Sequence, residues 1–317
     1  MKTFSKLHYS ILPTPLHKLE NLSKRFKTDI YCKRDDLTGF AFGGNKTRKL
    51  DYLIYEAIQN EADTIIAVGA YQSNFCRIAS AYGAATGLEV WLVLGGIKPE
   101  KTTGNLLLDN LFGAKIHDVD SFNWDDWEKE AGELKKALED QGKKVYQMPI
   151  GGSTRTGALG YIDCMKEIKE FSDKDNTYFR IIFHATGSAG TQAGLVVGKS
   201  ITGYDTIING FAITKNAKQI TDEVEALCNE TAWKIEKGFK KEDIVVDDGY
   251  IGESYGAVTR EANEAISLFA REEGILLDGV YSGKAAAGMI DYIRKGKFNT
   301  EDNLLFIHTG GNIQLFK

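Results

Sequence analysis

One lysine of this chain stands where its amine could do covalent chemistry. The sequence Gly-Gly-Asn-Lys-Thr-Arg-Lys over residues 43–49 places Lys46 after two glycines and soon after the extended run 30–34. Glycines let other groups approach the backbone closely, and a positioned lysine amine attacks carbonyl carbons. Taken alone, the segment fits a solvated helix start equally well, because most lysines and arginines lie on the surface. Lys46 therefore needs partners before it indicates a function.

Two further segments supply such partners. The polar turn 69–74 (Gly-Ala-Tyr-Gln-Ser-Asn) follows the apolar run 64–68, and the small-residue turn 185–191 (Ala-Thr-Gly-Ser-Ala-Gly-Thr) follows the run 180–184. Each pattern predicts a buried strand that ends in a turn opening a helix. In an open α/β sheet, ligands bind at the carboxyl ends of the strands. We therefore expect the three segments to meet at one site.

The second of these turns has the composition of a phosphate-binding loop, with residues Gly187, Ser188, Ala189, Gly190 and Thr191. Backbone N–H groups, two hydroxyls and a helix N-terminus favour a dianionic phosphate without a basic residue. A plain helix cap by Ser188 or Thr191 explains the same residues, so this turn alone is a weak signal. A Walker A loop does not fit, because Asn45 precedes Lys46 where that motif has glycine.

Composition narrows the classes of function. The chain has 317 residues, of which 43% are hydrophobic and 26% charged, and its net charge is -5. These values are typical of a globular protein long enough for two domains, and they argue against a nucleic-acid or anionic-membrane surface. The apolar runs are strand-sized, and the N-terminus leads into no apolar core of signal-peptide length, so the sequence predicts a cytoplasmic protein.

Cysteine and histidine spacing predicts neither disulfides nor a metal site. The four cysteines lie far apart in the sequence without paired spacing, and the five histidines show no ligand pattern. Cys76 lies close to the polar turn 69–74, but a small buried thiol is the more common role for such a residue.

Strand-like and helix-like segments alternate along the chain. Strands are expected at residues 29–33, 63–69, 89–94, 144–148, 179–185, 206–213 and 304–308. Helices are expected at residues 47–60, 74–86, 124–141, 155–170, 189–200, 216–235, 258–273 and 284–295. This alternation predicts βα units and a mainly parallel sheet covered on both faces. The polar stretches 97–104 and 171–177 are expected to be surface loops, and the acidic segment 242–248 a solvated connection.

A lysine, an amide-bearing turn and a phosphate cup are together the parts needed to hold pyridoxal phosphate. The chain resembles the pyridoxal-phosphate enzymes of the 1-aminocyclopropane-1-carboxylate deaminase and D-cysteine desulfhydrase family, which share the tryptophan synthase β-subunit fold. The resemblance covers nearly the whole chain, and its five ordered motifs occupy residues 33–37, 42–49, 72–74, 186–191 and 280–284.

The resemblance implies roles for the matching residues. Lys46 matches the Schiff-base lysine, which also transfers the substrate proton, and Asn74 matches the residue that contacts the ring hydroxyl. Ser73, with Gln72 nearby, matches the position that meets the substrate carboxylate, and the turn 187–191 matches the phosphate loop.

Two tyrosines, Tyr255 and Tyr281, match residues that face the substrate in this family. Judged without the resemblance, both fit the more common role of a tyrosine packed with its hydroxyl at the surface.

Two positions separate the branches of this family. Ser282 falls where a group meets the pyridine nitrogen; the deaminase branch has glutamate there, and the desulfhydrase branch has a neutral hydroxyl residue. A serine supports a ring cation less than a carboxylate does, which favours expulsion of a good leaving group over opening of a cyclopropane. Thr309 also favours the desulfhydrase branch, which has threonine at this position, whereas the deaminase branch has leucine.

The expected reaction is the β-elimination of D-cysteine to pyruvate, ammonia and hydrogen sulfide. A 1-aminocyclopropane-1-carboxylate deaminase that gives 2-oxobutanoate and ammonia is the alternative, and a non-catalytic pyridoxal-phosphate carrier is a third possibility. The resemblance also implies a two-domain, three-layer parallel-sheet fold of the fold type II enzymes. In it, a small α/β domain (49–159) is inserted into a large cofactor-binding domain (1–48 and 160–317). A small amino acid as substrate and a homodimer are implied as well.

Overall fold

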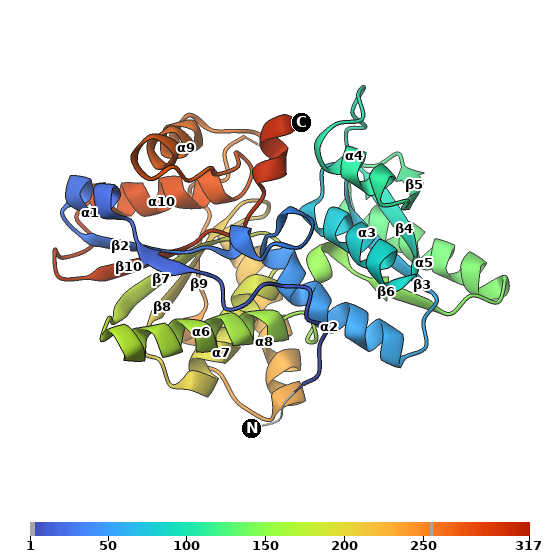
Figure 1. Ribbon diagram of the computed structural model, residues 1–317, viewed down its shortest axis with the longest axis horizontal. Helices are drawn as coiled ribbons and strands as arrows, with labels where there is room; N and C mark the ends of the chain where they lie inside the picture. Colours follow the sequence, from blue (N-terminus) through green and yellow to red (C-terminus); the bar gives the residue numbers. More distant parts are fainter. Residues whose placement is uncertain (1–3, 254–255) are drawn as a thin grey trace.

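The protein is described by a computed structural model that covers residues 4–253 and 256–317. It has an α/β fold with two separate sheets (Figure 1). The larger sheet has the order β1-β2-β10-β7-β8-β9, and the smaller one β5-β4-β3-β6. The strands are β1 (Leu16–Lys18), β2 (Asp29–Lys33), β3 (Thr64–Ala70), β4 (Glu89–Gly95), β5 (Lys115–Val119), β6 (Val145–Met148), β7 (Phe179–Thr186), β8 (Ile207–Ala212), β9 (Val245–Asp247) and β10 (Asn303–Ile307).

Ten α-helices of the described residues cover these sheets. They are α1 (Glu20–Phe26), α2 (Asn45–Gln59), α3 (Asn74–Thr86), α4 (Gly104–Leu111), α5 (Trp124–Asp140), α6 (Leu159–Asp175), α7 (Gly190–Thr202), α8 (Ala217–Ile235), α9 (Arg260–Glu273) and α10 (Ser282–Arg294). None of those between residues 4 and 253 or between 256 and 317 is long and apolar enough to cross a membrane.

The larger sheet joins the two ends of the chain. Strand β10 pairs in parallel with both β2 and β7, and only β1 at the edge runs antiparallel to its neighbour. Apolar residues of α6, α7 and α8 pack on one face of this sheet, and those of α1, α9 and α10 on the other. Such two-sided cover explains why the central strands are almost continuously apolar.

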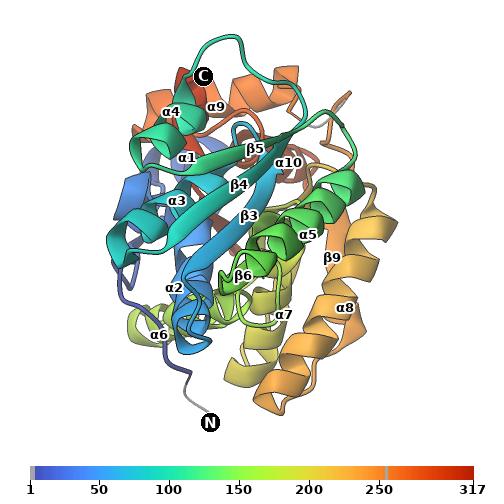
Figure 2. The ribbon, with the colours of Figure 1, turned by 90° about the vertical axis from the view of Figure 1, so that its right-hand side faces the viewer.

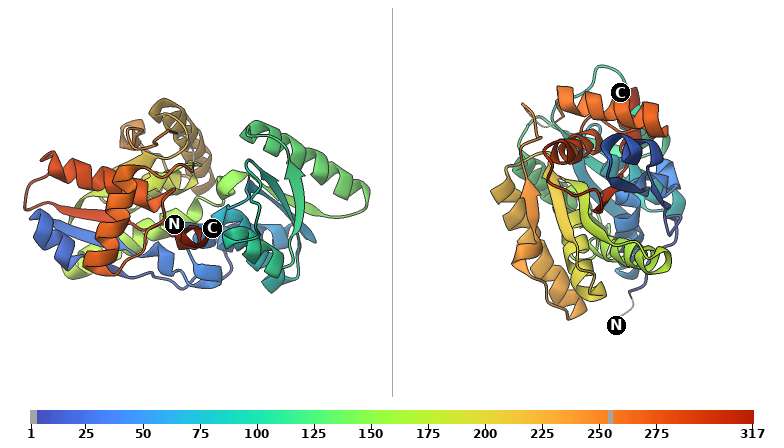
Figure 3. Two further views of the ribbon diagram at one scale, coloured as in Figure 1. Left: turned by 90° about the horizontal axis from the view of Figure 1, so that it is seen from above. Right: turned by 90° about the vertical axis from the view of Figure 1, so that its left-hand side faces the viewer.

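The smaller sheet is entirely parallel and has its own two-sided core. Helices α2, α3 and α4 pack on one face and α5 on the other (Figure 2). Helix α2 also reaches the larger core through Tyr52, so it lies between the two sheets. Seen from above, the C-terminal segment lies between the two sheets as well, where it packs on α4 (Figure 3).

Each of the seven predicted strands and eight predicted helices is present. Three short strands (β1, β5, β9) and two short helices (α1, α4) were not predicted, because three to eight residues give too little periodicity to detect. Two loop predictions were wrong. Helix α6 continues through most of the polar stretch 171–177 and ends at Asp175, which is followed by Asn176 in the left-handed region. Strand β9 forms an edge strand within 242–248.

The predicted inserted segment 49–159 contains all four strands of the smaller sheet. All six strands of the larger sheet lie outside it, in 1–48 and 160–317. Helix α2 crosses the first boundary, because it starts at Asn45 and ends at Gln59. The division of the chain into two domains at these boundaries stays a prediction.

Candidate active site

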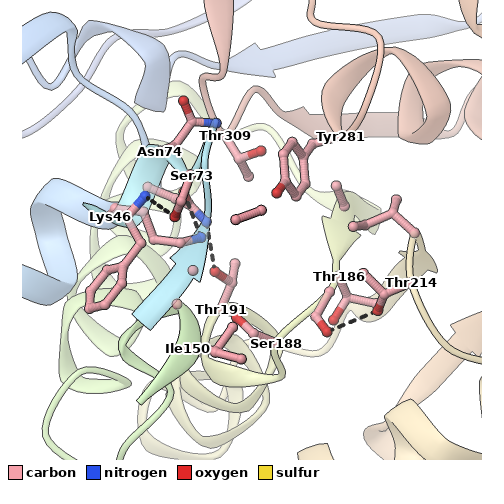
Figure 4. Close-up of a pocket in the computed structure, with 18 of the residues that line it drawn as sticks. Lys46, Ser73, Asn74, Ile150, Thr186, Ser188, Thr191, Thr214, Tyr281 and Thr309 are labelled. Carbon is pink, nitrogen blue, oxygen red and sulfur yellow. Dashed lines mark hydrogen bonds between the residues drawn. The ribbon is translucent and has the colours of Figure 1, made fainter. Parts of the chain in front are cut away.

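A cavity lies between the two sheets, where the N-termini of α2, α3 and α7 converge (Figure 4). The space between its walls amounts to about 790 Å³, a figure that includes open solvent at its mouth. In Figure 4, Lys46, Ser73 and Asn74 lie on one side of the cavity, and Tyr281 lies on the other. The three segments singled out in the sequence therefore meet at one place.

Most residues predicted for the site line this cavity: Lys46, Ser73, Asn74, Gly187, Ser188, Ala189, Thr191, Tyr281 and Thr309. Three others, Gln72, Gly190 and Ser282, are not among the described lining residues. Tyr255 lies outside the residues that the structure describes.

Lys46 is placed by a turn that requires glycine. Gly43 and Gly44 have φ values of 65° and 109°, and a Cβ on Gly43 would lie 2.4 Å from the carbonyl oxygen of Asp36. The turn delivers Lys46 into the cavity, where Nζ donates to Oδ1 of Asn45 at 3.3 Å. Burial and the nearby Arg77 guanidinium lower the pKa of Lys46 to about 8. About a tenth of the amine is therefore neutral, and hence nucleophilic, at pH 7, far more than for an ordinary lysine.

Ser73 and Asn74 open helix α3 at the edge of the cavity. The Ser73 hydroxyl caps the helix by accepting from the backbone N–H groups of Phe75 and Cys76, both at 3.2 Å. A hydroxyl that accepts twice still has its own proton to donate. Together with the positive end of α3, this proton makes the turn suited to a carboxylate.

The phosphate cup surrounds the N-terminus of α7. Ala189 has φ 56°, an unusual conformation for a residue with a side chain, and α7 begins at Gly190 directly after it. The side chain of Asn45 donates to Oγ1 of Thr191 at 3.0 Å, which ties the start of α2 to the cup. The N–H of Gly190 donates to the carbonyl oxygen of Ser188 at 2.6 Å. The later first-turn N–H groups of a helix have no partner within the helix, which makes this helix start suited to an anion.

A second lysine lies beside the cup and was not predicted. Lys49 is only 1% exposed, and its Nζ donates to the carbonyl oxygen of Gly151 at 3.2 Å. A Cβ on Gly190 would lie 2.7 Å from that Nζ. Burial, and then the charge of Lys46, lower the pKa of Lys49 well below its usual value. The available signal was its spacing, since Lys49 follows Lys46 by one helical turn.

Gln72 and Ser282 are engaged elsewhere. The Gln72 side chain donates to the carbonyl oxygen of Thr103 at 3.1 Å and accepts from the backbone N–H of Asn105 at 2.9 Å. Ser282 is 1% exposed, and its hydroxyl donates to Oδ1 of Asp278 at 2.6 Å. The Ser282 hydroxyl must therefore break this hydrogen bond before it can donate to a ligand.

Comparison with known proteins identifies the family. A family model described as "Pyridoxal-phosphate dependent enzyme" matches residues 7–310. The chain belongs to this family. A Serratia proteamaculans D-cysteine desulfhydrase is 40% identical over 312 residues, which is 96% of this chain and 92% of the relative. A Pyrococcus furiosus protein, provisionally named 1-aminocyclopropane-1-carboxylate deaminase, is 42% identical over 298 residues, 94% of this chain and 89% of that protein.

The fold agrees with this assignment. A crystal structure of a 1-aminocyclopropane-1-carboxylate deaminase homologue superposes with a TM-score of 0.92 at 35% identity, and the match covers 99% of this chain and 94% of that one. The predicted fold class and the expected cofactor are thus confirmed: this is a fold type II pyridoxal-phosphate enzyme.

The residues of the cavity fit pyridoxal phosphate. The cup at the start of α7, with the Lys49 amine beside it, suits a dianionic phosphate, and the partly neutral Lys46 amine suits an aldehyde. No group of three or more histidine, cysteine or carboxylate side chains in 4–253 and 256–317 is arranged to hold a metal.

Proposed function

We propose that this pyridoxal-phosphate enzyme is a D-cysteine desulfhydrase that produces pyruvate, ammonia and hydrogen sulfide. The observation that carries the proposal is the placement of Lys46, which lies in the cavity together with Ser73, Asn74 and the phosphate cup. The relative of that name is 40% identical over nearly the full length of both chains, which supports the choice of substrate.

Each group has a defined task in this proposal. Pyridoxal phosphate, when bound, joins amines through its aldehyde, and its ring accepts the electron pair released at Cα. Lys46 would hold the aldehyde of the cofactor, and its free amine would move the Cα proton of the substrate. A base with a pKa near 8 is well matched to this transfer at neutral pH. The Ser73 hydroxyl would donate a hydrogen bond to the substrate carboxylate, and the Asn74 amide would donate one to the ring oxygen.

Four further residues complete the proposed site. Lys49 and the first turn of α7 neutralise the phosphate. Tyr281 and Thr309, which line the cavity, face the substrate side chain. For Tyr255, which lies outside the described residues, a role toward the substrate is proposed from the family resemblance alone.

Ser282 and Thr309 favour the elimination of hydrosulfide. Ser282 offers a hydroxyl at the position where the deaminase branch has a carboxylate, so the ring is a weaker electron sink. The Ser282 hydroxyl donates to Oδ1 of Asp278, with 2.6 Å between the two oxygens. It must therefore rotate away from Asp278 before it can donate to the ring nitrogen. Hydrosulfide leaves readily and does not require the stronger sink.

One assay tests the proposal. The protein is incubated with D-cysteine, L-cysteine, D-serine and 1-aminocyclopropane-1-carboxylate, and pyruvate, sulfide and 2-oxobutanoate are measured. We expect equal amounts of sulfide and pyruvate from D-cysteine. Formation of 2-oxobutanoate from the cyclopropane amino acid, without sulfide from D-cysteine, would instead establish the deaminase, which the names of two relatives favour. Bound cofactor without turnover of any of these amino acids would indicate the carrier.

The cytoplasmic location and the homodimer are part of the same proposal. The homodimer is supported by the family resemblance, and the location by the strand-sized apolar runs of the sequence. Sedimentation of the protein with its cofactor tests the dimer, for which a single species of twice the chain mass is expected.

A further inference from the structure

Asn105, the second residue of α4, lies behind the cavity wall and contacts Asn74. Asn105 is fully buried, and among the described residues Asn74 lines the cavity whereas Asn105 does not. The Asn105 Nδ2 donates to Oδ1 of Asn74 at 3.0 Å and to the carbonyl oxygen of Gln72 at 2.8 Å. Its Oδ1 accepts from Nη1 of Arg77 at 3.0 Å. A side chain that belongs to another helix thus touches a residue of the cavity.

Arg77 determines which way the two amides point. A guanidinium can only donate hydrogen bonds. Its Nη1 lies 3.3 Å from Oδ1 of Asn74 and 3.0 Å from Oδ1 of Asn105, so each amide must turn its oxygen toward it. Asn105 then has its NH₂ group available for the oxygen of Asn74. Because Asn74 uses its oxygen for both contacts, its NH₂ group remains for the cavity, and Figure 4 shows the nitrogen on the side of Thr309.

We propose that Asn105 is a positioning residue that holds the Asn74 amide with its NH₂ group toward the cofactor ring. The inference rests on the role proposed above for Asn74, which donates to the ring oxygen. If the Asn74 amide were reversed, its oxygen would face the ring oxygen, and two acceptors would repel each other. Asn105 prevents this reversal, because a reversed Asn74 would present NH₂ to both Arg77 and the NH₂ group of Asn105.

The start of α4 is fixed to the same turn. Gln72 accepts from the backbone N–H of Asn105 at 2.9 Å and donates to the carbonyl oxygen of Thr103 at 3.1 Å. Gly104 leaves room for this contact, since a Cβ there would lie 2.5 Å from Oε1 of Gln72. Gln72 therefore keeps Asn105 within hydrogen-bonding distance of Asn74. In this proposal Gln72 supports the site from outside the cavity.

The substitution Asn105→Asp tests the proposal. It preserves side-chain shape and gives Arg77 an anionic partner, but it places a carboxylate oxygen beside Oδ1 of Asn74 and so drives the amide to reverse. We expect the affinity for pyridoxal phosphate, measured by titration of the visible absorbance, to fall at least about tenfold. We also expect the pH midpoint of the bound cofactor's absorbance change to rise by about one unit, because the ring oxygen loses a donor.

Three variants serve as controls. Asn110→Asp makes the same change at an exposed position of the same helix and should leave both measurements unchanged. Asn105→Ala removes the donor without inserting an acceptor, so its shift of the pH midpoint should be smaller than that of Asn105→Asp. If Asn105 acted only by packing, Asn105→Ala would give the larger shift. In an Asn74→Ala background, Asn105→Asp should have no further effect on the pH midpoint.

The results separate this inference from the proposed function. If the unmodified protein titrates normally with pyridoxal phosphate but Asn105→Asp behaves like Asn110→Asp, the positioning role of Asn105 is overturned and the proposed function is not. A persistent effect of Asn105→Asp in the Asn74→Ala background also overturns it. If the unmodified protein develops no visible absorbance with pyridoxal phosphate, or Lys46→Ala retains it, the proposed function fails first.

Discussion

Helix α2 carries two kinds of buried cation. Arg48 is fully paired: its guanidinium makes two hydrogen bonds to Asp35, at 2.8 and 2.9 Å, and two to Glu167, at 2.7 and 2.8 Å. Lys46 and Lys49, on either side of it in sequence, have only neutral oxygens as their described partners, at 3.3 and 3.2 Å. One helix therefore joins a closed ionic cluster to an open cavity.

The difference shows in the protonation equilibria. Burial alone would raise the pKa of Asp35, but the charge and hydrogen bonds of Arg48 lower it, so this pair stays ionised. Burial without an anionic partner lowers the pKa values of both lysines. Buried charges that are paired fix a structure, whereas unpaired buried amines indicate a site for an anion or a carbonyl compound. Three substitutions in α2 and one pH dependence test this distinction.

The largest effect is expected for Lys46→Ala. We expect kcat/KM to fall by about 10³-fold or more, because both the covalent anchor and the proton-transferring base are lost. The visible absorbance of the cofactor should change with it, while the thermal unfolding temperature of the cofactor-free protein stays nearly the same. Lys218→Ala, at an exposed lysine, is the control. Retention of full lyase activity by Lys46→Ala would falsify its assignment.

Arg48→Met should have the largest effect on stability. The substitution leaves Asp35 buried without its cation, which costs about 3–5 kcal/mol in the free energy of unfolding measured with denaturant. Arg180→Met breaks the partly exposed pair with Asp302 and should cost no more than about 1 kcal/mol. Equal losses for the two variants would contradict the prediction that the buried pairing of Arg48 stabilises the fold more than a partly exposed ion pair does.

Lys49→Met should separate binding from stability. The cofactor-free protein is expected to be at least as stable as the unmodified one, because an unpaired buried amine is removed. Affinity for pyridoxal phosphate should fall about tenfold or more, through loss of a charged hydrogen bond to the phosphate. Affinity for pyridoxal without phosphate should not change, and a matching loss with both compounds would place Lys49 outside the phosphate site.

The smallest effect is a pH dependence of cofactor capture. Only the neutral amine attacks the aldehyde, so the capture rate should rise with pH and level off above about 8, the pKa of Lys46 in the cofactor-free protein. Between pH 7 and pH 8 the neutral fraction grows about fivefold. Stopped-flow absorbance measures the rate, and the rate of Lys46→Ala, which reports the N-terminal and other amines, is subtracted from it. A rate that still increases tenfold per unit above pH 9 would show an ordinary surface lysine.

Much of the fold could be read from the sequence. Buried strands such as β3 are long apolar runs, and helices such as α3 begin at a capping serine and end at a glycine, which are local signals. The short edge strand β9 gave no such signal, because only three partly buried residues form it.

For the site, the sequence by itself was enough to predict Lys46, the Ser73–Asn74 turn and the phosphate cup as site residues. Each lies where a strand end is followed by a helix start, which is a local pattern. Only the tertiary structure decided the rest. It placed Lys49 beside Gly190, joined Arg48 to Asp35 and Glu167, and brought Asn105 from α4 behind Asn74. These contacts join residues of different elements, and a hydrogen-bond partner or an unpaired charge exists only once those elements pack, so no local pattern encodes them.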